Sequence, residues 1–192
     1  SYAASVLVAL QRQALHRPPR AAVRAMNTAL ILMADHELNM STFAARIAAS
    51  AGADLYACLS AALATVSGPR HGGACDRVEA LIAEAERAGD AAQVVRERLR
   101  RGETVPGFGH PLYPQGDPRT PPILELAREL AEKRSRLRVF FDVIAAMREA
   151  GHPPLTVDFG LVGLTLALGL PPGSASCLFA VGRSAGWVAH IL

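Results

Sequence analysis

Three histidines stand in polar or glycine-rich segments where an imidazole could take part in proton transfer. His36 lies in Asp-His-Glu, His71 in Pro-Arg-His-Gly-Gly, and His110 in Gly-Phe-Gly-His-Pro. An imidazole is the one side chain whose ordinary pKa allows it to give and take protons near neutral pH. Simpler roles fit the same local sequence, because His36 could be a packed core histidine and His71 could cap a turn.

His71 precedes an amphipathic segment that contains Val78, Leu81 and Ile82 at helical spacing. At a helix N-terminus, unpaired N–H groups and the positive end of the dipole disfavour a protonated imidazole. A neutral imidazole in that place can donate a hydrogen bond to a developing enolate oxygen. His71 is therefore a candidate enolate stabiliser.

His110 and Arg119 share a segment, 105–119, that is rich in proline and glycine. Proline fixes φ and glycine permits positive φ, so such a loop has a defined path without helix or strand hydrogen bonds. An imidazole held there can hydrogen-bond a carbonyl oxygen, and a guanidinium can bind a carboxylate bidentately. Asp117 fits a turn residue before Pro118.

Two charged residues stand in otherwise apolar stretches. Asp158 opens the apolar segment from Phe159 to Leu170, where it could cap a helix or act as a general base. Arg183 interrupts the apolar run 177–182, and a buried arginine requires an anionic partner. That partner could be a protein carboxylate or the carboxylate of a substrate.

Composition narrows the class of protein. The 192 residues are 51% hydrophobic and 19% charged, enough for one large domain or two small ones with a packed core. The net charge is only +3, and the arginines are spread along the chain, which argues against nucleic-acid binding. No apolar run reaches the roughly 18 residues of a membrane span.

Cysteine and histidine spacing gives no sign of a metal or a disulfide framework. Cys58, Cys75 and Cys177 are far apart, and no His-x-His or His-x-x-x-His pair is present. We expect reduced thiols, a cytoplasmic protein and no bound metal. His16, His152 and His190 are assigned no chemistry.

The elements that must position these residues are predicted to be helices. Apolar residues recur at helical spacing almost throughout, and no stretch keeps a period of two. Ser41 or Thr42 could cap a helix after Asn39, and Pro121 with Pro122 suits a helix start. Gly89, Gly102 and Gly151 suit helix ends, so the sequence predicts an all-α fold.

Taken in order, these segments resemble the citrate synthase family over most of the chain, from about residue 30 to the end. The matching segments are Asp-His-Glu-Leu-Asn at 35–39, Gly-Pro-x-His-Gly-Gly-Ala at 68–74, Pro-Gly-Phe-Gly-His at 106–110, Asp-Pro-Arg at 117–119, Val-Asp-Phe at 157–159, and Phe-Ala-x-x-Arg-x-x-Gly-Trp-Val-Ala-His at 179–190.

The resemblance implies a role for each candidate residue. His71 would stabilise the enol of an acyl-CoA thioester, Asp158 would remove its α-proton, and His110 would polarise the ketone of oxaloacetate. The carboxylates of oxaloacetate would be held by His36, Arg119 and Arg183. Coenzyme A would take part as a thioester substrate, with no permanently bound cofactor.

The resemblance also implies a multi-helical homodimer with a large and a small domain that close over the substrates. The small domain would comprise residues 72–162, and the large domain would take segments 1–71 and 163–192.

Two residues depart from the usual family pattern, Cys75 in place of asparagine and Pro111 in place of arginine. A further C-terminal arginine of the family lies beyond residue 192, so we expect either part of a longer protein or a chain that is not a working synthase.

The expected activity is therefore an acyltransferase that condenses acetyl-CoA with oxaloacetate to give citrate and CoA, in the tricarboxylic acid cycle. A 2-methylcitrate synthase and a citryl-CoA lyase use the same chemistry and stay open alternatives. So does a non-catalytic module that senses CoA or oxaloacetate, although such a sensor would have no need of Asp158 as a base.

Overall fold

The structure is a computed structural model that describes residues 1–11, 18–131 and 135–192. Within these residues it contains ten α-helices and no strand beyond one isolated bridge, which confirms the predicted all-α fold. The helices are α1 (Tyr2–Gln11), α2 (Arg20–Met33), α3 (Met40–Ser50), α4 (Leu55–Val66), α5 (Ala74–Ala88), α6 (Ala91–Arg100), α7 (Thr120–Glu129), α8 (Ser135–Glu149), α9 (Val157–Leu168) and α10 (Ser174–Ile191).

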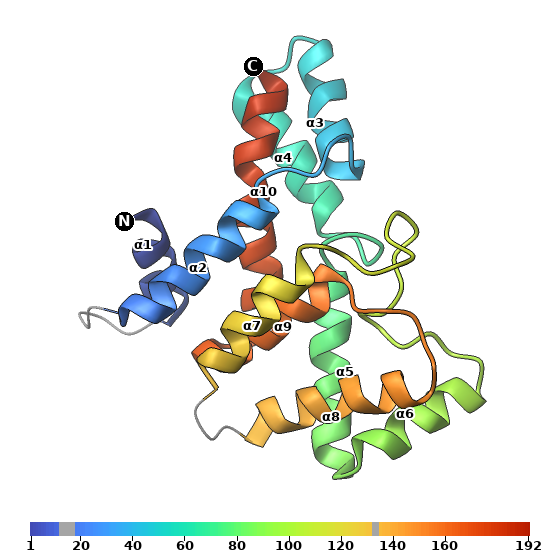
Figure 1. The fold of residues 1–192 in the computed structure, drawn as a ribbon. Helices are drawn as coiled ribbons and strands as arrows, with labels where there is room; N and C mark the ends of the chain where they lie inside the picture. The colour runs from blue at the N-terminus through green and yellow to red at the C-terminus, as the bar shows by residue number, and fades with distance from the viewer. Residues whose placement is uncertain (12–17, 132–134) are drawn as a thin grey trace.

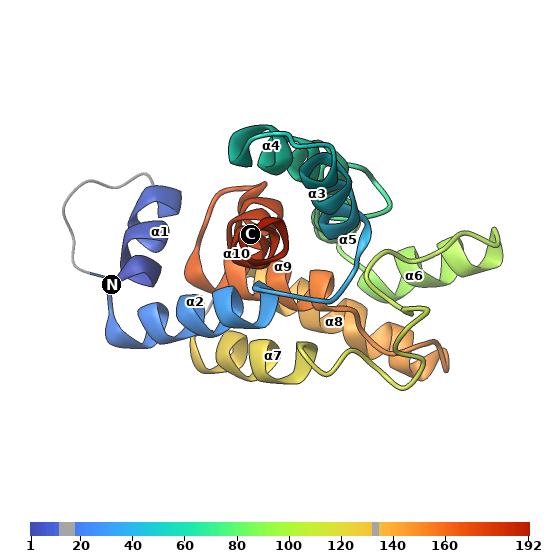
Figure 2. The same cartoon turned by 90° about the horizontal axis from the view of Figure 1, so that it is seen from above.

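Helix α10 is a central element of the fold, because five other helices pack against it. It packs against α2, α3, α4, α5 and α9, and the view along its axis in Figure 2 shows the other helices around it. The antiparallel pair α3 and α4 lies beside the C-terminal end of α10 in Figure 1, whereas α6 and α8 lie at the opposite end of the molecule. Segments far apart in sequence therefore meet around α10.

Helix α9 is largely buried, and it carries Asp158 near its N-terminus. Ten of its twelve residues are buried, and it packs against α7, α5, α10, α8 and α2. A helix that is apolar on every side belongs in the core. Gly163 allows this packing, because an added Cβ would collide with the ring of Phe140.

Helix ends mostly follow the sequence signals, with one correction. The cap of α3 is Asn39, whose side chain accepts hydrogen bonds from the backbone N–H groups of Ser41 and Thr42. Ser41 and Thr42 are themselves inside the helix and fully buried, so the expectation that either would be the cap was wrong. Proline does occupy the start of α7, and Gly89 ends α5 in the left-handed conformation, as predicted.

The loop of residues 105–119 and the segment just before α9 are joined by backbone hydrogen bonds next to the N-terminus of α9. Phe108 and Leu155 form the isolated antiparallel bridge, and Thr156 donates its backbone N–H to the carbonyl of Gly107 over 2.9 Å. Gly107 has a φ of +84°, and a Cβ there would lie 2.5 Å from Cδ2 of Phe159. The loop that carries His110 is thus held against the start of the helix that carries Asp158.

No helix in the described ranges is long and apolar enough to cross a membrane.

Candidate active site

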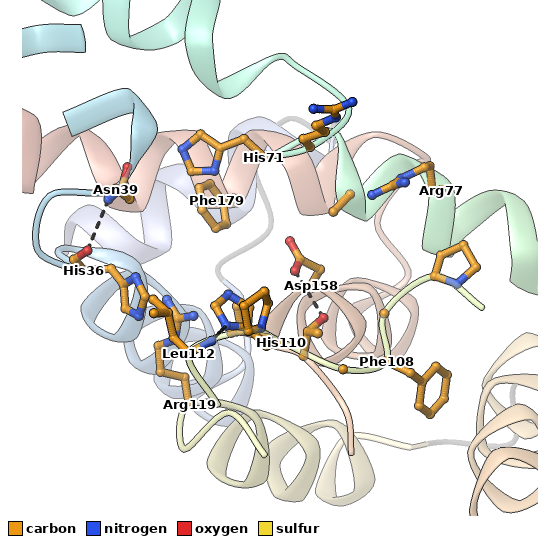
Figure 3. A pocket seen from close by; sticks show the side chains of 18 of the residues that line it. His36, Asn39, His71, Arg77, Phe108, His110, Leu112, Arg119, Asp158 and Phe179 are labelled. Atoms are coloured by element: carbon orange, nitrogen blue, oxygen red, sulfur yellow. Dashed lines mark hydrogen bonds between the residues drawn. The ribbon is translucent and has the colours of Figure 1, made fainter. Parts of the chain in front are cut away.

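A cavity of about 550 Å³ opens where the loop of residues 105–119 meets the start of α5, the start of α9 and the middle of α10. All six residues singled out from the sequence line it, and Figure 3 shows Asp158 between His71 and His110. The six are His36, His71, His110, Arg119, Asp158 and Arg183. Tertiary structure therefore joins segments separated by almost 150 residues.

His71 precedes α5, and its ring is held by neighbours from two other helices. Its Nε2 lies 2.8 Å from the hydroxyl of Ser41, which accepts a hydrogen bond from Nε1 of Trp187 over 3.1 Å. The ring also packs edge-on against Phe179, with centroids 5.6 Å apart. Burial, followed by the charge of Arg183, lowers the pKa of His71 to about 4. The imidazole is therefore neutral at physiological pH, and the main cause is burial rather than the helix N-terminus that the sequence suggested.

His110 is held in one tautomer by its own loop. Its Nδ1 accepts the backbone N–H of Leu112 over 3.1 Å. A nitrogen that accepts a hydrogen bond carries no proton, so in the neutral ring the proton is on Nε2. That N–H is left to donate to an oxygen within the cavity.

His36 follows α2 in a tight turn that contains Glu37, a non-glycine residue with a positive φ of 50°. Its Nε2 lies 2.6 Å from the hydroxyl of Tyr113. Burial, with the charges of Arg119 and Arg183, lowers the pKa of His36. Because His36 contacts Tyr113 and is only partly buried, it is not the packed core histidine that the sequence left open.

Arg119 is anchored by Asp117, which is more than the turn residue the sequence suggested. Nε and Nη2 of Arg119 donate to the two carboxylate oxygens of Asp117 over 2.9 and 2.7 Å. Asp117 is buried, and the ion pair with Arg119 lowers its pKa although burial acts in the opposite direction. The bidentate pair fixes the guanidinium at the wall of the cavity.

Arg183 is almost fully buried, and its hydrogen bonding is incomplete. Nε donates to the carbonyl of Met33 over 2.7 Å, and the guanidinium lies 5.0 Å from the ring centroid of Phe179. Nη2 has no hydrogen-bond partner within the described residues, and no carboxylate there forms an ion pair with Arg183. Burial lowers its pKa to about 10, so it stays charged at neutral pH. The protein carboxylate considered as its partner is thus not found, and Nη2 fits an anion within the cavity.

Asp158 is the second residue of α9, and the cap position belongs to Thr156. Its carboxylate faces the cavity, and burial raises its pKa. Hydrogen bonds from Thr156 and Cys75 act in the opposite direction. A carboxylate that is easier to protonate than usual is suited to general-base chemistry near neutral pH.

The remaining histidines lie away from this constellation. His190 pairs with Asp35 over 3.3 Å and lies 3.3 Å from Arg46, and His152 is exposed beside the proline-rich segment before α9. His16 lies outside the described residues. No group of three or more His, Cys, Asp or Glu residues within the described ranges could share a metal ion.

Sequence reasoning did not single out Tyr113, Ser41 or Trp187 as neighbours of the candidate histidines. Tyr113 follows His110 by three residues, a spacing that could have been noticed within the loop. From the sequence Ser41 fits only a helix cap, and Trp187 lies 116 residues after His71. Their contacts with the histidines depend on how α3 and α10 cross.

The chain is similar in sequence to a known family of proteins. The family model described as citrate synthase, C-terminal domain, matches residues 1–192. The chain is 35% identical over 176 residues to citrate synthase 2 of Bacillus subtilis and 34% identical over 172 residues to 2-methylcitrate synthase of Shewanella oneidensis. Each match covers 88% of this chain and 46% of the relative, so the chain spans about half the length of the curated relatives it matches.

Solved structures show the same fold. A citryl-CoA lyase from Hydrogenobacter thermophilus superposes with a TM-score of 0.85 at 28% identity, covering all of this chain and 75% of that one. A citrate synthase from Thermoplasma acidophilum, in ternary complex with carboxymethyl coenzyme A and oxaloacetate, superposes with a TM-score of 0.84 at 31% identity, covering all of this chain and 52% of that one. From the family match over its whole length and these relatives, the chain belongs to the citrate synthase family.

Proposed function

We propose that this chain carries the catalytic residues of a citrate synthase reaction, in which acetyl-CoA condenses with oxaloacetate to give citrate and free CoA. One observation carries the proposal. A carboxylate with a raised pKa, Asp158, lines the same cavity as a neutral histidine, His71, and a histidine with its proton on Nε2, His110. These are the base and the two hydrogen-bond donors that a carbon–carbon condensation through an enol requires.

The chemical steps follow from these groups. Asp158 removes a proton from the methyl carbon of the thioester, while His71 donates a hydrogen bond to the thioester oxygen. The enol carbon then attacks the ketone carbon of oxaloacetate, and Nε2–H of His110 protonates the ketone oxygen as the new bond forms. Water hydrolyses the resulting citryl thioester, which releases citrate and the CoA thiol. Each donor stands ready before charge develops, which is how a fixed polar site lowers a barrier.

Oxaloacetate brings two carboxylates, and the cavity offers fixed cations for them. Arg183 presents an Nη2 without a protein partner among the described residues, and Arg119 is held by Asp117 at the cavity wall. The neutral ring of His36 adds a further hydrogen-bonding group. We assign His36, Arg119 and Arg183 to oxaloacetate.

Two more arginines fit the phosphates of coenzyme A. Arg70 and Arg77 line the cavity beside His71, are exposed, and form no ion pair within the described part of the chain. Figure 3 shows the side chain of Arg77 on the same side of the cavity as His71. With four arginines and a single carboxylate in its lining, the cavity favours anionic substrates.

We further propose a homodimer. Helices α3 and α4 carry large apolar side chains that are at least one-third exposed: Met40, Phe43, Ile47, Leu55, Tyr56 and Leu63. A patch of this kind marks an interaction surface in a water-soluble protein. A second copy of the chain is the occupant that matches it, because a twofold interface pairs one patch with itself.

Domain closure is part of the same proposal. Residues 72–162 would form the small domain and segments 1–71 and 163–192 would belong to the large domain, with loops 67–73 and 105–119 as the moving connections. The protein would act in the cytoplasm, in keeping with free thiols at Cys58, Cys75 and Cys177.

The decisive experiment measures release of free thiol from acetyl-CoA in the presence of oxaloacetate, with the product of the native open reading frame and its Asp158→Asn variant. We expect turnover by the wild type and a loss of at least about a thousandfold in kcat for the variant, with oxaloacetate binding retained. Binding without turnover in the wild type would instead identify a sensor module.

The same assay separates the related activities. Higher kcat/KM with propionyl-CoA would identify a 2-methylcitrate synthase. Cleavage of citryl-CoA to acetyl-CoA and oxaloacetate, with no net synthesis of citrate, would identify a lyase. Sedimentation analysis tests the dimer, since Phe43→Glu with Ile47→Glu should shift the protein to monomers while the exposed change Arg96→Glu on α6 should not.

A further inference from the structure

We infer that Cys75 and Thr156 are positioning residues that hold the two carboxylate oxygens of Asp158 in the orientation needed for proton removal. The hydroxyl of Thr156 donates to Oδ2 over 3.1 Å, and the thiol of Cys75 donates to Oδ1 over 3.5 Å. The two donors come from different elements, the loop before α9 and the first turn of α5. The inference rests on the proposed role of Asp158 as the base.

Thr156 occupies a position where its hydroxyl would normally serve the helix. It is the N-cap residue of α9, with a φ of −90° and a ψ of 165°, yet its side chain forms no capping hydrogen bond. A threonine at this position usually accepts a backbone N–H of the first turn. Here the hydroxyl is a donor to a side chain two residues later, so Thr156 serves the carboxylate instead of the helix.

Cys75 is fully buried against the other carboxylate oxygen. Burial, together with the adjacent negative charge of Asp158, raises the pKa of the Cys75 thiol well above its ordinary value. The sulfur therefore keeps its proton throughout the neutral range and is a hydrogen-bond donor. A residue so placed is unsuited to act as a thiolate nucleophile.

One donor on each oxygen fixes the plane of the carboxylate. An ionised carboxylate accepts hydrogen bonds at about four lone-pair positions, so positions remain for the incoming proton after two are occupied. Both donors also favour the ionised form and counteract the effect of burial. The other charged or titratable groups around Asp158 are the arginines and histidines of the cavity lining: Arg119 at the start of α7, Arg183 on α10, Arg70 before α5, Arg77 on α5, and His36, His71 and His110. None of these donates a hydrogen bond to the carboxylate of Asp158.

Matched variants separate positioning from packing. Thr156→Val keeps the shape of the side chain and removes the donor, whereas Thr156→Ser keeps the hydroxyl. Cys75→Ala and Cys75→Ser form the corresponding pair. Cys58→Ala removes a buried thiol from α4, outside the cavity, and is the control for loss of a cysteine.

The readout is the pH at which Asp158 titrates, measured by NMR on protein labelled with ¹³C at the aspartate carboxyl carbon. The Asp158 signal is assigned by its absence in Asp158→Asn. We expect Thr156→Val to raise the midpoint by about one pH unit, a tenfold change in acid strength, because the ionised form loses a donor. Cys75→Ala should raise it by about half a unit, since a thiol is the weaker donor. Thr156→Ser and Cys58→Ala should keep the wild-type midpoint to within about 0.2 unit, and Cys75→Ser, which replaces the thiol by a stronger donor, should not raise it.

The acidic limb of kcat/KM for the acyl-CoA should move to higher pH by the same amounts, because only the ionised carboxylate accepts the proton. Unchanged midpoints in both Thr156→Val and Cys75→Ala, with the proteins folded by circular dichroism, would overturn the inference. Should Thr156→Val fail to fold, Thr156→Ala replaces it. The titration needs no turnover, so shifted midpoints in a protein that releases no thiol would refute the proposed synthase activity and leave the two hydrogen bonds established.

Discussion

The hydroxyl of Ser41 lies 2.8 Å from Nε2 of His71 and accepts the indole N–H of Trp187. The indole nitrogen is only a donor, so the single hydroxyl proton of Ser41 is free for another acceptor. Two acceptors lie within reach, Nε2 of His71 and Oδ1 of Asn39, which also accepts two backbone N–H groups at the start of α3. Donation to Oδ1 of Asn39 would make Nε2 of His71 the donor to Ser41, whereas donation to His71 leaves the ring proton on Nδ1, where it can point into the cavity. The proposed role of His71 as a hydrogen-bond donor to the thioester requires the second arrangement.

Loss of the Ser41 hydroxyl should therefore weaken catalysis more than substrate binding. In Ser41→Ala the His71 ring loses the group that selects its tautomer, and we expect kcat to fall about tenfold with the KM for oxaloacetate little changed. Stopped-flow or steady-state thiol release measures both constants. Ser50→Ala, an exposed change in the same helix, is the control. A rise in KM with full kcat would contradict this role.

Tyr113 should act on oxaloacetate through His36. Removing its hydroxyl in Tyr113→Phe deletes the 2.6 Å contact with Nε2 of His36 and leaves the aromatic ring in place. We expect the Kd for oxaloacetate, measured by calorimetry, to rise about five- to tenfold, because one hydrogen bond contributes roughly 1 kcal/mol. Tyr2→Phe, on the exposed face of α1, should bind as the wild type does. Equal affinity of Tyr113→Phe and Tyr2→Phe for oxaloacetate would rule out a role of the Tyr113 hydroxyl in binding.

The partly buried histidines His36 and His71, whose pKa values are both lowered, should make the fold sensitive to acid. The pKa of His71 is about 4 in the folded protein, against 6.5 for an ordinary histidine, so between these pH values the unfolded chain binds more protons. Stability is then full above about pH 6.5 and is lost as the pH falls toward 4. We expect the drop in Tm between pH 7.0 and pH 4.5 to be smaller in His71→Gln than in the wild type. Part of the drop in Tm should remain in His71→Gln, because the pKa of His36 is also lowered. The exposed change His152→Gln should leave the drop in Tm as it is in the wild type.

Glycine at position 107 should be necessary for the fold of the His110 loop. Gly107→Ala places a Cβ 2.5 Å from the ring of Phe159 at a φ of +84°, combining a steric clash with backbone strain. We expect the free energy of unfolding, measured in urea, to fall by about 3 kcal/mol or more. Gly89→Ala has a similar φ of +71° with no atom near the new Cβ, so it should cost only about 1 kcal/mol. Equal losses would mean that the clash is relieved by movement of the loop.

Much of the architecture could be predicted from local sequence. The apolar residues at helical spacing indicated an all-α fold, and the glycine and proline signals located the start of α7 and the end of α5. Cap identity was harder to predict, because Asn39, Ser41 and Thr42 all have capping side chains. Burial decided between them, since Ser41 and Thr42 point into the core and Asn39 is left to bind the free N–H groups.

The sequence by itself determined the helical fold, the family and the set of six polar residues that line one cavity, because helical periodicity and short motifs are local properties of the chain. Only the tertiary structure decided what each of those residues touches. The partners of Asp158, His71 and Arg183 come from elements up to 150 residues away, and such contacts depend on how helices cross. The same packing desolvates the side chains, and desolvation shifts the pKa values of Asp158 and His71 in a direction that no local pattern records.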